Sequence, residues 1–145
     1  MQGGRPKARE VLFRVLFEVE VSGDDAVESL EYSLARYHLS EDARDHVVDM
    51  ARAFARSQAE IDARISATLH GWSFSRLSVV VRAVLRVAVT ELLFAPDIPV
   101  EIVLDQAIRI AQRYGEDGAD AFVNGVLDRI ASDVRENGTT GVGEK

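Results

Sequence analysis

Residues 77–94, LSVVVRAVLRVAVTELLF, form the most apolar stretch of the chain and decide how it folds. The run 79–81 alone would suit a β-strand, because β-branched side chains favour a pleated backbone. Eighteen residues without glycine or proline are, however, too long for a typical strand. The positions of Val80, Val84 and Val87 follow the three-four spacing of one helix face. A helix that is apolar nearly all round is typical of the centre of a helical bundle.

Outward from this stretch, the apolar spacing is helical along the whole chain, so the sequence predicts an all-α fold. Prolines and capping residues indicate where the other helices begin. The expected starts are at Pro6, Asp24–Asp25, Ser40, Ser75 or Ser78, and the segment 97–99. The segment from Ser40 to Gly71 is long enough for one long helix or two collinear ones. We expect one helical domain over residues 1–136 and a disordered tail over 137–145, NGTTGVGEK.

The composition excludes several classes of protein. A chain of 145 residues fits one domain, and its hydrophobic share of 47% argues against wholesale disorder. Because cysteine is absent, disulfides, thiol catalysis and cysteine metal sites are excluded. Charges interrupt every apolar run well before 18 residues, and no signal peptide is visible, so the cytoplasm is the expected compartment.

The charge is unevenly distributed. The net charge of −7 argues against nucleic-acid binding, since phosphate contacts need a positive surface. Residues 1–14, however, hold Arg5, Lys7, Arg9 and Arg14 against only Glu10. This local excess of positive charge is compatible with phosphate contacts, although arginine richness also tracks GC-rich genomes.

No pattern in the sequence supports catalysis. His38, His46 and His70 lack metal-ligand spacing and are expected at surface or boundary positions, so neither a metal nor a cofactor is predicted. Arg86 and Glu91 lie within the apolar central helix, five residues apart. We expect each to find a structural partner on another helix.

Several short motifs, in this order and spacing, resemble the NusB family of bacterial transcription antitermination factors. They extend from about residue 5 to residue 134, and the closing run Phe122–Asp128 is the most family-specific. The matching pieces are Ala8-Arg9-Glu10, Val15-Leu16-Phe17, Ile61-Asp62, Gly71-Trp72-Ser73, Arg82-Ala83-Val84-Leu85-Arg86, Glu91-Leu92-Leu93, Asp97-Ile98-Pro99 and Phe122-Val123-Asn124-Gly125-Val126-Leu127-Asp128.

The resemblance implies an all-α fold of about seven helices in two packed subdomains. It also implies a function without catalysis. NusB-like proteins bind boxA, a single-stranded RNA element, together with NusE, a small-subunit ribosomal protein. Within the RNA polymerase antitermination complex this pair promotes processive transcription of ribosomal RNA operons. Some relatives pair over their RNA surface, so a homodimer is a further expectation to test.

The same resemblance implies site residues. The implied RNA-binding residues are Arg5, Lys7, Arg9, Phe17, Gly118, Phe122 and Asn124. The implied NusE-binding residues are Arg76, Arg82 and Arg86. Cations would hold the RNA backbone and aromatic rings would stack on bases. Core packing is an equal alternative for both phenylalanines, because they also fit apolar stripes, and helix packing or capping is one for the asparagine.

The chain also departs from the family pattern. Its basic N-terminal segment is thin, Val81 and Gln106 stand where relatives commonly carry acidic residues, and Gly118 stands where some members do. The alternative function is therefore a helical protein-interaction scaffold whose RNA binding is weak or depends on a partner.

Asn124–Gly125 gives conflicting signals within 120–131, DAFVNGVLDRIA. The pair is a strong turn signal, whereas the apolar spacing around it predicts a helix. We expect the helix to form in spite of a glycine cost of about 1 kcal/mol. The expected reason for Gly125 is close approach of another helix or an RNA backbone, so that Gly125→Ala would damage packing or binding.

Overall fold

Six α-helices and one short 3-10 helix make up the described part of the computed structural model. It describes the backbone of residues 4–23 and 25–143 and the side chains of residues 5–23 and 25–135. The elements are α1 (Gly4–Ser22), α2 (Ala26–Leu34), α3 (Glu41–Ala67), η1 (Phe74–Arg76), α4 (Val79–Phe94), α5 (Val100–Tyr114) and α6 (Ala119–Gly143). The all-α prediction is confirmed. No helix among the described residues is long and apolar enough to cross a membrane.

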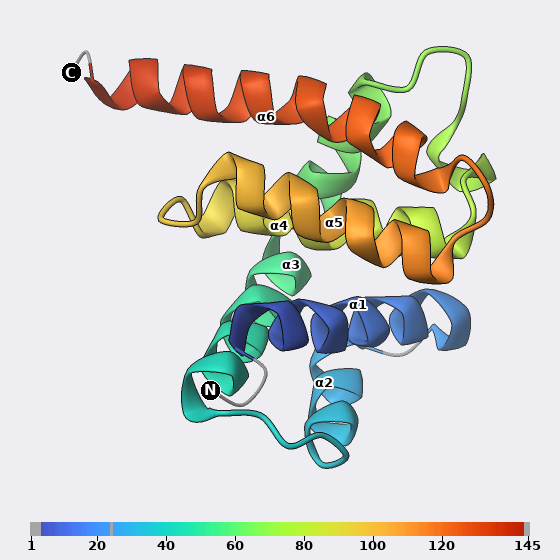
Figure 1. Cartoon of the computed structure of the whole chain (residues 1–145), viewed down its shortest axis with the longest axis vertical. Coiled ribbons are helices and arrows are strands. Elements are labelled where there is room, and N and C mark those ends of the chain that lie inside the picture. The colour runs from blue at the N-terminus through green and yellow to red at the C-terminus, as the bar shows by residue number, and fades with distance from the viewer. Residues whose placement is uncertain (1–3, 24, 144–145) are drawn as a thin grey trace.

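The helices pack as two groups that share α4. Helices α1, α2 and α3 contact one another, and α4, α5 and α6 form a second set of mutual contacts. Helix α4 also packs against α1 and α3. Helices of both groups therefore bury its nearly continuous apolar surface, as its sequence predicts. Figure 1 shows α5 running in the same direction as α1 and lying between α1 and α6.

Side-chain caps begin three of the helices where the sequence predicts them. The carboxylate of Asp25 accepts from the Val27 amide, and the hydroxyls of Ser40 and Ser78 accept from amides three residues further on. Of the two candidates before the central helix, Ser78 is therefore the cap. Helix α3 runs from Glu41 to Ala67, but Ser57 within it has a non-helical backbone conformation. The observed segment is therefore intermediate between the one long helix and the two collinear helices that the sequence predicts.

A buried polar cluster joins the two groups of helices. Glu91 of α4 is fully buried and receives a hydrogen bond from Arg9 of α1 at 2.7 Å. The other oxygen of Glu91 lies 2.5 Å from His46 Nε2 of α3. The structural partner predicted for Glu91 is thus confirmed. The surface or boundary position expected for His46 is wrong, because this ring is buried against the carboxylate.

The last helix settles the conflict at Asn124–Gly125, since both residues lie inside α6. The expected close approach of another helix at Gly125 is wrong, because a Cβ added there would meet none of the described atoms within 4 Å, while the approach of an RNA backbone stays a prediction. Helix α6 continues to Gly143, through most of the region where the sequence predicts a disordered tail. The side chains from 136 onward, and residues 144–145, lie outside the described residues, so the boundary at 136 stays a prediction.

Candidate functional site

The first turns of α1 present two free cations. Arg5 and Lys7 are both exposed, and among the described residues neither forms an ion pair with a carboxylate. The Lys7 ammonium lies 5.6 Å from the centre of the Tyr37 ring, within the range of a cation–π contact, and the residue is still exposed to solvent. These two side chains have the exposure that a phosphate contact requires.

Arg9 does not belong to this surface, which corrects the expectation from the sequence. Only 3% of its side chain is exposed, and its guanidinium pairs with the buried Glu91. Arg5 lies one helical turn before Arg9 on the same face of α1, but it stands at the exposed start of the helix, whereas Arg9 is covered where α1 packs against α4. Its role is to neutralise a buried carboxylate.

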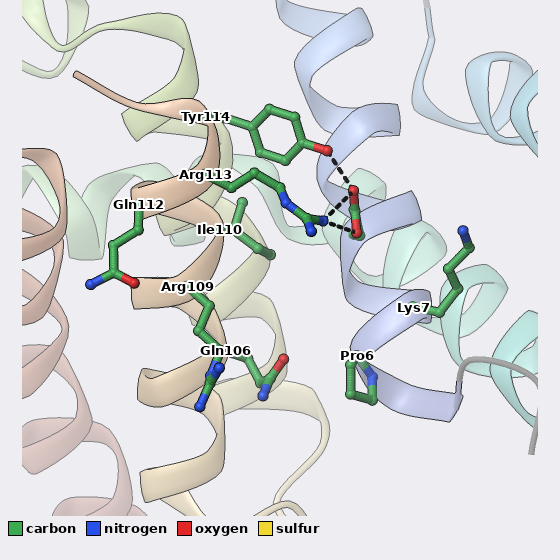
Figure 2. Close-up of a pocket in the computed structure, with 9 residues that line it drawn as sticks. Pro6, Lys7, Gln106, Arg109, Ile110, Gln112, Arg113 and Tyr114 are labelled. Atoms are coloured by element: carbon green, nitrogen blue, oxygen red, sulfur yellow. Dashed lines mark hydrogen bonds and ion pairs between the residues drawn. The ribbon is translucent and has the colours of Figure 1, made fainter.

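A second polar cluster joins α1 to the end of α5. The carboxylate of Glu10 accepts hydrogen bonds from Arg113 at 3.0 and 3.2 Å and from the hydroxyl of Tyr114 (Figure 2). Arg14 donates to the same hydroxyl at 2.7 Å. Burial alone would raise the pKa of Glu10, but the Tyr114 hydrogen bond and the two arginines outweigh it and lower this pKa. The cluster fixes the two helices side by side.

The Phe17 ring is half-buried. It packs against the core and lies 6.0 Å from the ring of Phe13, which itself stacks on Tyr114 at 5.0 Å. Phe17 also lines a shallow groove toward α2 with Val21 and Tyr32, both of which are exposed. Its ring therefore has a packed side and an open side, so packing and base stacking remain compatible.

Gly118, Phe122 and Asn124 lie together at the start of α6. Gly118 has a φ of +89°, a left-handed conformation that favours glycine, and its carbonyl accepts from the Phe122 amide. Phe122 is half-buried and Asn124 is exposed. Figure 1 shows this helix start and the start of α1 at opposite ends of α5. The structure thus places the predicted RNA-binding residues in two separate groups.

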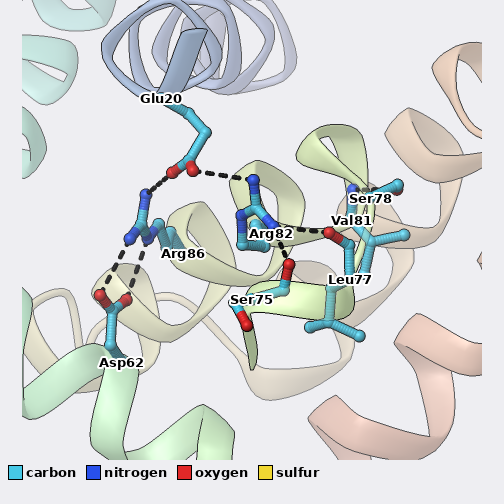
Figure 3. A network of polar contacts seen from close by, with 8 residues as sticks. All are labelled: Glu20, Asp62, Ser75, Leu77, Ser78, Val81, Arg82 and Arg86. Carbon is cyan, nitrogen blue, oxygen red and sulfur yellow. Dashed lines mark hydrogen bonds and ion pairs between the residues drawn. The ribbon is translucent and has the colours of Figure 1, made fainter. Parts of the chain in front are cut away.

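Two of the three arginines expected to contact NusE are engaged in bonds inside the fold (Figure 3), so their contact with NusE stays a prediction. Arg86 is buried and forms two hydrogen bonds of 2.9 Å with Asp62 and one of 2.7 Å with Glu20. Arg82 donates to Glu20 at 2.8 Å and to the carbonyls of Ser75 and Leu77. Through Glu20 and Asp62 the two arginines hold α4 against α1 and α3. For Arg86 this confirms the expected structural partner on another helix.

Arg76 remains exposed, next to a tryptophan that the sequence reading did not single out. Trp72 is 57% exposed, and with Arg76, Val81 and Phe122 it lines a hollow of about 190 Å³ between η1 and the start of α6. Exposed tryptophan and arginine are enriched at protein interfaces. The sequence contained a signal for this site, because a tryptophan in a short connection between helices has few core residues to pack against.

The sequence reading also missed Arg109 and Arg113 of α5. Together with Gln106 they follow a spacing of three and four residues, which places all three on one helix face. Both arginines are well exposed, with 68% and 65% of the side chain accessible. Among the described residues, no group of three histidine, aspartate or glutamate side chains could hold a metal ion.

Known proteins resemble this chain in sequence over most of its length. The profile of the NusB family matches residues 6–132. The transcription antitermination protein NusB of Thermotoga maritima is 40% identical over 133 residues, which cover 92% of this chain and 94% of that protein. The NusB of Bacillus subtilis is 36% identical, with 92% and 98% covered.

Solved structures agree with these relatives. A crystal form of T. maritima NusB superposes with a TM-score of 0.85 at 41% identity, covering 92% of this chain and 94% of that one. A complex of the antitermination factors NusB and NusE with double-stranded RNA contains a chain that matches with a TM-score of 0.83 at 28% identity. That match covers 91% of this chain and 98% of the other. The chain belongs to the NusB family.

Proposed function

We propose that this chain is a cytoplasmic, non-catalytic transcription antitermination factor that binds boxA RNA of ribosomal RNA operons together with NusE. In this role it promotes processive transcription by RNA polymerase. The observation that carries the proposal is its match, over 91% of its length, to a chain in a complex of NusB and NusE with RNA. The antitermination proteins among its relatives support the same role.

The RNA surface consists of two groups of residues. Arg5 and Lys7 hold phosphates at the start of α1, since they are exposed cations without an acidic partner among the described residues. Phe122 and Asn124 at the start of α6, after the turn at Gly118, contact bases by stacking and hydrogen bonding. The open side of the half-buried Phe17 ring adds a stacking surface on α1.

NusE binds around the hollow formed by Trp72, Arg76, Val81 and Phe122. Trp72 supplies apolar area, and Arg76 supplies an exposed charge at the edge. Phe122 belongs to this hollow and to the RNA surface alike, so the partner and the RNA meet at the start of α6. This shared position favours joint binding of NusE and RNA.

One observation favours the alternative of a protein-interaction scaffold with partner-dependent RNA binding. The burial of Arg9 leaves Arg5 and Lys7 as the only free cations among the described residues of the first turns of α1, in a chain of net charge −7. RNA affinity without NusE is therefore expected to be low.

A titration with fluorescently labelled RNA tests the proposal. We expect boxA RNA to bind more tightly than a scrambled RNA of the same length, and more tightly again with NusE present. If the two RNAs bind equally in the presence of NusE, the chain is a scaffold and the RNA-specific role is wrong.

A further inference from the structure

A groove with both polar and apolar lining residues lies between α1 and α5, beside the predicted RNA surface. It has a volume of about 670 Å³ and is lined at its edges by Lys7 of α1 and by Gln106, Arg109, Gln112 and Arg113 of α5. Figure 2 shows the two arginines and Gln106 projecting from α5, across from the first turns of α1. The groove is wide and open, so it suits an extended chain better than an enclosed small molecule.

The groove is less acidic than the chain as a whole. Its lining contains the guanidinium groups of Arg109 and Arg113 against the carboxylate of Glu10, a balance of +1 in a chain of net charge −7, whereas the Lys7 side chain points from the edge of the groove toward Tyr37 (Figure 2). Asp105 lies nearby and pairs with Arg109 at 3.0 Å, but this pair is exposed and therefore weak in water. A polyanion would find a favourable local potential here.

Both arginines keep free hydrogen-bond donors. Arg109 uses only Nε for Asp105, and Arg113 uses only Nη1 for Glu10. A guanidinium carries five N–H donors in a flat fork that matches phosphate oxygens, so each retains donors directed to solvent. Since Glu10 also anchors Arg113 to α1, that guanidinium is held in place before a ligand arrives.

The position of α5 places these arginines between the two groups of predicted RNA-binding residues. Arg109 and Arg113 lie one helical turn apart, about 6 Å along the axis. At the end of α5, Gln112 donates to Asp120 at 3.1 Å and so joins this helix to the start of α6. The exposed face of α5 therefore leads from Lys7 toward Gly118, between the two groups of predicted RNA-binding residues.

We propose that the groove between α1 and α5 binds the sugar–phosphate backbone of the single-stranded RNA, with Arg109 and Arg113 each contacting a phosphate. This inference rests on the proposed function and adds to it the path that the RNA takes between its two groups of contacts. It also explains how a chain with a thin basic N-terminal segment keeps enough cations for an RNA. The arginines of α5 replace those that α1 lacks.

The test compares the double variant Arg109→Gln/Arg113→Gln with the control Arg52→Gln/Arg56→Gln, in the full-length chain with NusE at a fixed saturating concentration. Arg52 and Arg56 are exposed on α3 and form no ion pair with a described residue, so both variants reach the same net charge. The readout is the affinity for labelled boxA RNA at several salt concentrations. Each lost phosphate contact removes about 0.7 from the slope of log K against log salt.

We expect the groove variant to flatten this slope by about 1.4 and to weaken RNA binding about 25-fold at 0.1 M salt, while the control stays near the wild type. Arg109→Gln alone, whose only bond among the described residues is to the exposed Asp105, should give half of the slope change and keep the wild-type melting temperature. Unchanged slope and affinity in the groove variant, or an equal loss in the control, would overturn the inference and leave the proposed function standing. A groove variant that loses NusE affinity instead would assign the groove to the protein partner and overturn it as well. Failure of the wild-type chain to bind boxA RNA with NusE present would overturn both.

Discussion

Replacing Arg9 by methionine should destabilise the fold strongly, although exposed arginines in the same segment should be replaceable. Glu91 is fully buried, and the Arg9 side chain 2.7 Å away is its only arginine or lysine partner among the described residues. Removing one partner of a buried ion pair leaves the other charge uncompensated and costs about 3–5 kcal/mol. For a chain of this size, that loss lowers the melting temperature by roughly 6–20 °C.

Urea unfolding followed by circular dichroism measures this loss, with Arg5→Met as the matched control. Arg5 is exposed and has no ion-pair partner among the described residues, so its replacement should change the free energy of unfolding by about 0.5 kcal/mol or less. The double variant Arg9→Met/Glu91→Leu removes both charges and should recover part of the stability, since it also leaves the buried His46 ring without its carboxylate partner. A loss below about 1 kcal/mol for Arg9→Met would refute the reasoning.

The other predictions concern α6, Glu10 and the partner surface. Gly125→Ala should raise the free energy of unfolding by up to about 1 kcal/mol in urea titrations, because its Cβ meets open space and alanine favours a helix; a loss would reveal a contact there. Because the pKa of Glu10 is lowered in the folded chain, its contribution to stability is present above about pH 4.5 and is lost as the pH falls further. Glu10→Gln should therefore flatten the dependence of unfolding free energy on pH in the acid range, and an unchanged profile would contradict the Glu10 cluster. Trp72→Ala should weaken NusE binding at least 10-fold in calorimetric titrations with little change in melting temperature, since this side chain is 57% exposed; equal affinity would place NusE elsewhere.

Local signals in the sequence predicted the helices well. Ser40 and Ser78 cap their helices through short-range hydrogen bonds, which depend only on neighbouring residues. The apolar spacing around Asn124–Gly125 outweighed the turn signal, because burial of Val123, Val126 and Leu127 requires the helix.

Side-chain roles that depend on distant residues could not be predicted in the same way. Arg9 looks like part of a basic segment, but its partner Glu91 is 82 residues away in the chain. The groove beside Lys7 exists only because α5 packs next to α1, about a hundred residues later. Gly125 was assigned to a close approach that the packing of α6 does not provide.

The most direct test of the central claim is transcription in vitro through a terminator placed downstream of boxA, with RNA polymerase, NusE and the other antitermination factors present. We predict that adding this chain raises terminator read-through on the boxA template and has no effect when boxA is scrambled. Equal read-through with and without the chain, or an increase that does not depend on boxA, would contradict the account.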